Sequence, residues 1–343
     1  MMTAKSSLAL TLVLAAAAAL PTIAQTVAQP QPELGWIYRE TAKDYRQRAR
    51  YPESSRAILA GEKDPIKEKR TPTRQSLRAP DGSELAVWSS AVSVEVGEPV
   101  DLFASFDTRG KAAPAELITG EIANAAGGVV AEVTYRDDGH GADHRANDGI
   151  WSARLALPAG LEPAQTEGGA ESFMVRTRAR LGNGDLREAN GGFLVSHPAA
   201  RLTGRYRDSL REGNLVLSAE VEVKAAGRFH LAGTLYDMKG EPVGTAQAAA
   251  VLEPGRQWIE LSFYGLMFQD RQVAGPFRVG TLALATVNGM PNAFNRLVEN
   301  AHVTRAYNLR QFSRDPFGEK SFLEAAERLE AEAALRPLMQ LPE

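Results

Sequence analysis

The chain has 343 residues, of which 44% are hydrophobic and 24% are charged, and its formal net charge is −3. The length suits two or three domains, and the slightly negative charge argues against a general attraction to nucleic acid. The sequence contains no cysteine, which excludes disulfides, cysteine-ligated zinc and a thiol nucleophile.

Residues 1–24 have the pattern of a secretory signal peptide. Lys5 precedes an apolar run over residues 8–20, and Pro21 and small residues follow it. The run is shorter than the roughly 20 residues that a transmembrane helix needs. We therefore expect export to the periplasm or the exterior, a mature chain that begins near Gln25 or Gln29, and no transmembrane segment in it. An uncleaved N-terminal anchor is the alternative.

Residues 25–80 are expected to form a linker and a basic arm. Between residues 39 and 78, twelve Lys or Arg stand against six Asp or Glu. Thr41 as N-cap predicts a short helix over residues 41–50 that ends before Pro52, and later prolines predict an extended chain. We expect the arm to lie across the domain that follows it, held by Trp36, Tyr38, Tyr45, Tyr51 and Ile58. Its charge is either a solvated face or a contact with an acidic surface such as lipopolysaccharide or a partner.

From residue 81 onward, apolar and polar residues alternate in short runs that Gly, Pro, Asn and Asp interrupt. In one such run, Leu215, Leu217, Ala219, Val221 and Val223 fall on one side of a strand. Short strands with frequent turns are typical of antiparallel sandwiches rather than of alternating strands and helices. The sequence predicts an all-β protein with two tandem immunoglobulin-like β-sandwiches, at residues 81–198 and 199–310.

The last segment, residues 311–343, changes to a helical period. Phe322, Ala326, Leu329 and Ala333 fall on one face, and Ser321 and Glu324 have the spacing of a capping box. We expect this C-terminal helix to pack against the second sandwich. The alternative is a small helix that binds a partner.

An acidic loop between two predicted strands is the strongest candidate for chemistry. Asp137, Asp138, Asp143 and Asp148 lie within a dozen residues, together with three glycines that permit sharp turns. Carboxylate oxygens are the ligands that calcium prefers, so these four aspartates are the predicted metal ligands. The spacing is not that of an EF-hand. A loop in which Asp side chains cap backbone amides is the alternative interpretation.

Other chemistry has little support in the sequence. His140 and His144 flank Asp143 and could join a zinc site, but the glycines argue against the helix that would bring the two rings to one face. The sequence has no nucleophile elbow, no metalloprotease motif and no phosphate-binding loop. We therefore predict no catalytic residue, no cofactor other than calcium, and no enzymatic activity.

Several stretches together resemble a family of exported bacterial proteins with immunoglobulin-like domains, known as domain of unknown function 4785 and related to choice-of-anchor secreted proteins. The likeness rests on RYPESSR at 50–56 with DPI at 64–66, on the loop DDGHGADHRANDGIW, and on LYD at 235–237, LSFYG at 261–265, GPF at 275–277 and TRAY at 304–307. The resemblance implies an exported β protein, and it supplies no activity or catalytic residue.

These observations favour a non-enzymatic exported protein that acts as a binding or structural module of the cell envelope or exterior. One alternative is a hydrolytic, carbohydrate-active enzyme that uses the acidic loop, with paired carboxylates as acid and base. Another is an accessory subunit of an envelope complex that docks through the C-terminal helix.

Overall fold

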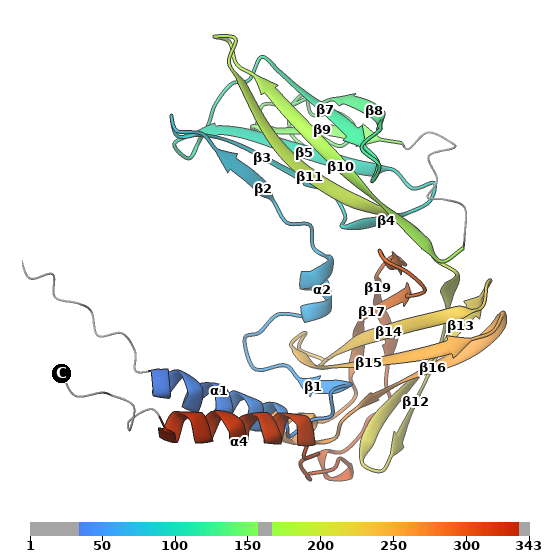
Figure 1. Ribbon diagram of the computed structural model, residues 1–343. Coiled ribbons are helices and arrows are strands. Elements are labelled where there is room, and N and C mark those ends of the chain that lie inside the picture. Colours follow the sequence, from blue (N-terminus) through green and yellow to red (C-terminus); the bar gives the residue numbers. More distant parts are fainter. Residues whose placement is uncertain (1–33, 157–166, 336–343) are drawn as a thin grey trace, which may run out of the picture.

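The computed structural model describes residues 34–156 and 167–335 (Figure 1). The predicted signal peptide and most of the linker lie outside the described residues. Among the residues described, no helix is both long and apolar enough to cross a membrane. The described chain is mostly β-strand in several sheets, with a few helices, which confirms the predicted all-β class.

The first sandwich consists of two sheets of five strands each. One contains β2 (Gln75–Arg78), β3 (Ser83–Ser89), β5 (Val100–Thr108) and β6 (Lys111–Ala112), with β9 (Ile150–Leu155) paired to β5. The other has the order β4 (Ser93–Glu95), β11 (Leu186–His197), β10 (Gly169–Arg180), β7 (Leu117–Ala123), β8 (Val129–Thr134). The pairings are antiparallel except that of β4 with β11, which is parallel.

The alternation in the sequence builds the core of this sandwich. Every second side chain of a strand faces the opposite sheet, so Leu85 and Val87 of β3 are buried against Phe173 and Val175 of β10 in one cluster. Trp151, on the strand that leaves the acidic loop, is half-buried and packs against this cluster.

The second sandwich also has two sheets. The larger has the order β1 (Ser55–Ala57), β15 (Pro242–Leu252), β14 (Gly227–Tyr236), β17 (Arg278–Thr286), β18 (Ala293–Phe294), with β19 (Val298–Val303) also paired to β17. The smaller has the order β12 (Ala200–Arg211), β13 (Asn214–Val223), β16 (Gly255–Phe263). A short helix, α3 (Leu266–Arg271), follows β16, and its Phe268 stacks on Phe312 with ring centroids 4.1 Å apart.

The N-terminal arm differs from the prediction in three ways. Its helix α1 spans Leu34–Arg48, so Thr41 is an interior residue whose hydroxyl donates to the Ile37 carbonyl at 2.8 Å rather than an N-cap. A second helix, α2 (Pro65–Arg70), interrupts the segment that the prolines were expected to keep extended. Most of the arm also packs on the second sandwich, not on the one that follows it in the chain: β1 pairs with β15, and Tyr51 belongs to the second core. Only its last strand, β2, joins the first sandwich, where it pairs with β3.

The C-terminal helix α4 (Lys320–Leu335) forms as predicted, but it packs on α1 (Figure 1). The rings of Tyr45 and Phe322 lie 5.8 Å apart, and Arg46 donates two hydrogen bonds to Glu330. The apolar stripe that was expected to contact the second sandwich is therefore covered by α1. The helix begins one residue before Ser321, whose hydroxyl bonds Glu319 instead of forming the predicted capping box.

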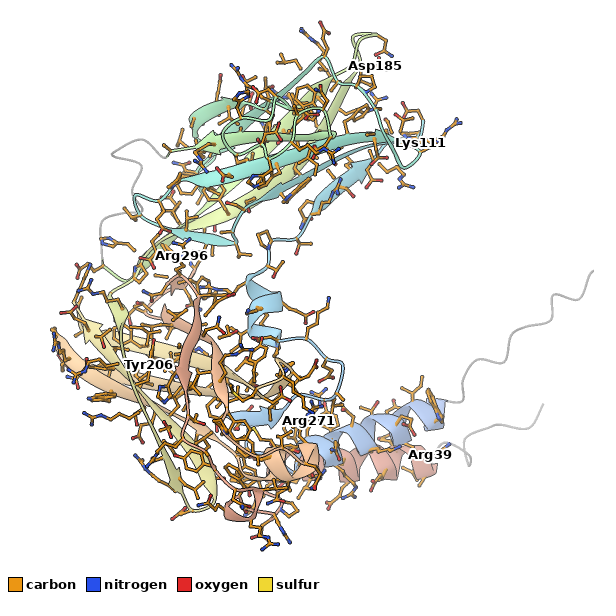
Figure 2. All side chains as sticks on the ribbon, turned by 180° about the vertical axis from the view of Figure 1, so that it is seen from behind. Arg39, Lys111, Asp185, Tyr206, Arg271 and Arg296 are labelled. Atoms are coloured by element: carbon orange, nitrogen blue, oxygen red, sulfur yellow. The ribbon has the colours of Figure 1, made fainter. Side chains whose placement is uncertain are left out.

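The two sandwiches meet at the ends of their sheets, and the arm runs along one side from α1 through β1 and α2 to β2 (Figure 1). At the junction the Arg296 amide donates to Glu95 at 2.9 Å, and the Phe294 amide donates to the Ser196 hydroxyl at 3.0 Å. Figure 2 shows Arg296 between the two bodies and Arg271 beside the base of the helical pair. In the order of the sequence, the first sandwich is thus inserted between the arm and the second sandwich, on which most of the arm packs.

Candidate functional site

The acidic loop connects β8 to β9 at one end of the first sandwich. Its base is fixed by Tyr135, which is buried and whose hydroxyl shares a hydrogen bond of 3.2 Å with Thr177. The next residue, Arg136, exchanges two backbone hydrogen bonds with Ser152 of β9, at 2.9 and 2.8 Å. Both ends of the loop are therefore attached to the sandwich, and the aspartates lie on a closed turn.

Glycine permits the sharp turns within the loop. Gly139 has φ +75°, where a side chain is strained, and a Cβ there would lie 3.1 Å from the Ala146 amide nitrogen. Gly149 has φ +84° at the point where the chain enters β9. The two positions let residues 137 and 148, eleven apart in sequence, face each other.

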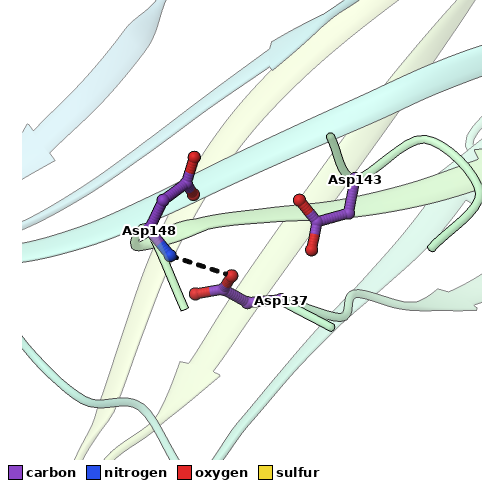
Figure 3. A group of neighbouring side chains, drawn as sticks. All are labelled: Asp137, Asp143 and Asp148. Carbon is purple, nitrogen blue, oxygen red and sulfur yellow. Dashed lines mark hydrogen bonds between the residues drawn. The ribbon is translucent and has the colours of Figure 1, made fainter. Parts of the chain in front are cut away.

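Three of the four predicted ligands come together. Asp137, Asp143 and Asp148 each offer a carboxylate oxygen, and these oxygens lie within 4.8 Å of one another (Figure 3). Asp137 accepts the Asp148 amide at 3.2 Å and the Gly149 amide at 3.0 Å, which closes the loop. Its carboxylate is thus held by the backbone on one side and faces the other two on the other side.

Asp143 is the most buried member of this group. It accepts the Gly139 amide at 2.5 Å and the Arg145 amide at 3.0 Å. These backbone hydrogen bonds lower the pKa of the Asp143 carboxyl, because they stabilise its charged form. Asp143 is therefore ionised at neutral pH, as a metal ligand must be.

Asp138 does not join the other three. Its side chain accepts the His140 amide at 3.0 Å and lies 3.9 Å from the Arg136 guanidinium. His140 is exposed, its Nδ1 contacts the Asp138 carbonyl at 2.8 Å, and neither it nor His144 belongs to the carboxylate group. The geometry thus supports an oxygen-ligand site of three aspartates rather than a mixed histidine site.

Three carboxylates at this separation suit a calcium ion. Each oxygen has two lone pairs, so an oxygen that accepts one backbone N–H can still bind a cation. Calcium takes six to eight oxygens in a flexible shell, which three carboxylates and backbone carbonyls could supply. Asp137, Asp143 and Asp148 would hold the ion, whose charge would offset their mutual repulsion.

Sequence reasoning missed a second carboxylate, Asp64 of the arm, which is buried on the second sandwich. It accepts hydrogen bonds from the hydroxyls of Thr234 at 2.8 Å, Tyr236 at 2.7 Å and Thr281 at 2.6 Å. Burial alone would raise the pKa of Asp64, but these hydrogen bonds outweigh it and lower the pKa. The signal in the sequence was Asp64 followed by Pro65, a typical N-cap and first residue of a helix.

A third carboxylate, that of Asp208 of β12, lies in the second sandwich, and its side chain is only 6% exposed. It accepts from His302 Nε2 at 2.7 Å and from the Tyr307 hydroxyl at 2.6 Å, and Arg305 donates to it from its amide and its side chain. Burial opposes ionisation, yet these donors lower the pKa of Asp208 to about 2. No local pattern could predict this network, because its members are more than ninety residues apart.

Comparison with known protein families finds a match for the second sandwich. Residues 199–310 match the family profile described as the C-terminal domain of DUF4785, a domain of unknown function. This stretch is therefore similar to the C-terminal domain of DUF4785. The match confirms the resemblance to DUF4785 that the sequence motifs indicated. No curated protein matches the chain.

Three solved structures are similar to parts of this chain at low sequence identity. A DUF4785 family protein from Legionella pneumophila is 18% identical, with a TM-score of 0.45, over 64% of this chain and 58% of that one. Native alpha-2-macroglobulin from E. coli is 15% identical, with a TM-score of 0.33, over 68% of this chain and 14% of that one. Latent PorU from Porphyromonas gingivalis is 11% identical, with a TM-score of 0.21, over 77% and 21%.

Proposed function

We propose that this protein is an exported, non-enzymatic protein that acts as a binding or structural module of the cell envelope or exterior. The observation that carries the proposal is the state of its buried carboxylates. Asp64 and Asp208 accept hydrogen bonds from several neighbours each and hold separate parts of the fold together. A catalytic acid or base needs a position from which it can exchange a proton with substrate, and saturated carboxylates of this kind serve structure instead.

Calcium at the acidic loop forms part of the same proposal. In this role the ion is structural: it would bind Asp137, Asp143 and Asp148 and tie β8 to β9 at the end of the first sandwich. An ion that binds the native state alone stabilises it by RT ln(1 + [L]/Kd), which is about 2.7 kcal/mol at a hundredfold excess over Kd. Magnesium should stabilise less, because it keeps its water and demands octahedral geometry.

The melting temperature of the mature chain tests the calcium role. We expect it to rise with millimolar calcium, to fall with chelator, and to respond weakly to magnesium. If the loop is instead a turn in which aspartates cap amides, the melting curve will be indifferent to calcium and to chelator, and the metal role is then withdrawn.

Export and the absence of catalysis are tested on the natural protein. N-terminal sequencing of the protein recovered from the periplasmic or extracellular fraction should find a first residue near Gln25 or Gln29. The same material, assayed on a panel of glycosides, polysaccharides and peptides, should show no turnover. Hydrolysis that disappears in Asp143→Asn would contradict the proposal and favour the enzyme that uses the acidic loop.

A further inference from the structure

Residues 49–71 of the arm occupy a continuous surface of the second sandwich, which is called the domain below. The strand β1 extends the larger sheet at its edge, with Ser55, Arg56 and Ala57 opposite Ala246, Thr245 and Gly244 of β15. Backbone hydrogen bonds continue on both sides: Gln247 donates to Ser54 at 2.8 Å and Ile58 donates to Val243 at 2.9 Å. The arm is thus bound as an added strand, the way extended peptides bind sheet edges in other proteins.

The acceptor edge is shaped for this strand. A Cβ on Gly244 would lie 2.9 Å from the Arg56 carbonyl oxygen, so a side chain at this position would obstruct the pairing. The amide of Tyr264 donates to the Ser55 hydroxyl at 2.9 Å. Backbone and side chain of β1 are therefore both contacted by the domain.

Two apolar anchors flank the strand. Tyr51 is 7% exposed and Ile58 is 2% exposed, and Tyr51 belongs to the core cluster of the domain. The Tyr51 hydroxyl donates to Asp270 of α3, and Arg50 bonds the other oxygen of the same carboxylate at 2.8 Å. Buried aromatic anchors of this kind carry much of the energy of protein interfaces.

The Asp64 carboxylate adds a specific polar contact. Three hydroxyls from β14 and β17 converge on it, and those of Thr234 and Thr281 belong to fully buried residues. Tyr236 reaches it because Gly280 on β17 leaves room for the ring, where any side chain would collide with it. Without a carboxylate in this place, buried hydroxyls would lose an ionised acceptor.

The end of α2 completes the contact. The Arg70 guanidinium lies 4.1 Å from the centre of the Phe294 ring and donates to the Asn295 carbonyl at 2.5 Å. Lys67 pairs with Glu299 of β19 at 2.9 Å. The contact therefore extends from α3, past the edge of β15 and across the strand ends of β14 and β17, to β18 and β19.

We infer that the second sandwich carries a recognition site for an aspartate-bearing peptide segment that is extended at β1 and helical at α2, and that residues 49–71 of the same chain are its ligand. The site contacts three features of the segment: an anchoring tyrosine, a short strand added to β15, and a carboxylate that accepts hydrogen bonds from three hydroxyls. The stretch 199–310 is thus completed by a segment that precedes the first sandwich in sequence, and the arm is bound to it as a peptide is bound to a receptor.

A native cleavage experiment tests this inference on the full chain. A site for a sequence-specific protease is introduced into the connection between α2 and β2, at residues 72–74, and the folded protein is cut. The N-terminal fragment should remain bound through size-exclusion chromatography. Its residence time is then measured by exchange against a fluorescent synthetic peptide that covers residues 34–71.

Matched variants identify which contact matters. Asp64→Asn keeps the shape of the side chain but turns an amide toward hydroxyl donors, and it should shorten the residence time by about tenfold or more. Glu53→Gln changes an exposed carboxylate of the same arm and should leave it unchanged. In the Asp64→Asn background, the double change Thr234→Val and Thr281→Val should shorten the residence time little further, because the two threonines act through their hydrogen bonds to Asp64.

Two results would overturn the inference. If the fragment leaves the unaltered protein as soon as the chain is cut, the arm is held by its covalent connection and not by a site. If Asp64→Asn and the parent exchange at the same rate, the contacts between α1 and α4 hold the fragment, and the carboxylate is not recognised.

Discussion

The aspartates of the acidic loop differ in role because they differ in backbone position. Asp143 accepts two amides and faces Asp137 and Asp148, whereas Asp138, one residue after Asp137, caps the next turn and points toward Arg136. Neighbouring residues in a tight turn point in different directions, so four aspartates in sequence give a group of three in space.

This difference gives a prediction for paired variants. Asp143→Ala should lower the free energy of unfolding by about 1–3 kcal/mol, since two amides lose their acceptor, and it should abolish the response of the melting temperature to calcium. Asp138→Ala should retain that response. Thermal melts of both variants, each with calcium and with chelator, check this, and a calcium response that survives in Asp143→Ala would contradict the assigned ligands.

Asp208 gives a prediction about pH. Its pKa is about 2 in the folded protein, below the value of about 3.9 of an unperturbed Asp. Folding is therefore favoured by its ionised form, and this stabilisation is present above about pH 4 and is lost as the pH falls toward 2. In Asp208→Asn the stability at neutral pH should drop by about 1–3 kcal/mol, and the acid transition should become shallower. Urea melts between pH 2 and pH 6 measure both, and an unchanged acid slope would count against the network.

At the scale of elements, the pair of helices α1 and α4 meets through small side chains. Ala42 of α1, Ala49 directly after α1, and Ala326 and Ala333 of α4 are buried. A Cβ added to Gly35 would lie 3.6 Å from the Ala333 carbonyl oxygen. Small residues let two helices approach closely, so shape complementarity rather than the exposed ion pair of Arg46 with Glu330 should hold the pair.

Overpacking tests this view of the helical pair. Ala326→Leu should destabilise the pair by about 1–3 kcal/mol, whereas Arg46→Ala should destabilise it much less, because solvent screens an exposed ion pair. Ala331→Leu, on the exposed side of α4, is the matched control and should be nearly neutral. Hydrogen exchange of the α1 amides reports the effect; equal protection in the two leucine variants would show that the contact tolerates bulk.

Strands could be predicted from the sequence because their signal is local. The alternation from Leu215 to Val223 predicted β13 without knowledge of its partners. The three-residue strand β1 could not be predicted, because its pairing with β15 depends on residues about 190 positions away. The start of α1 at Leu34 was not predicted either, because Thr41 has the pattern of an N-cap but lies inside the helix, where its hydroxyl donates to the Ile37 carbonyl.

The site was predictable to the same extent. The sequence showed an acidic loop with glycines, and three of its four aspartates lie close together in the structure. Asp64 and Asp208 were not recognised, because an isolated aspartate in a sequence carries no sign of the hydroxyls or the guanidinium that surround it after folding. Tertiary contacts, not composition, make them buried and ionised.

At the scale of the whole molecule, the two sandwiches have separate hydrophobic cores. One contains Leu85, Phe173 and Phe193, the other contains Leu217, Phe229 and Phe277, and the two clusters share no residue. Hydrogen bonds such as that from the Arg296 amide to Glu95 join the two bodies at the junction. Domains with hydrophobic cores of their own can unfold as separate cooperative units.

Scanning calorimetry should therefore resolve two transitions. Calcium should raise the transition temperature of the first sandwich and leave that of the second unchanged, because the acidic loop contacts β8 and β9. Asp64→Asn should lower the transition of the second sandwich, together with the arm, and leave the first in place. A single transition that both changes shift equally would mean that the junction couples the two bodies into one unit.

The position of Asp64 also sets an order of events while the protein is made. The residue is 217 positions before Thr281, which completes its set of hydroxyls. At roughly 5–20 residues per second, a ribosome needs about 10 to 40 seconds to add that stretch. Throughout this interval the surface that buries Tyr51 and Ile58 is incomplete. The first sandwich can therefore fold before the arm is bound. The arm leaves the ribosome before both sandwiches and is among the last segments to be placed, so a nascent or truncated chain exposes to proteases and chaperones a peptide that the finished protein hides.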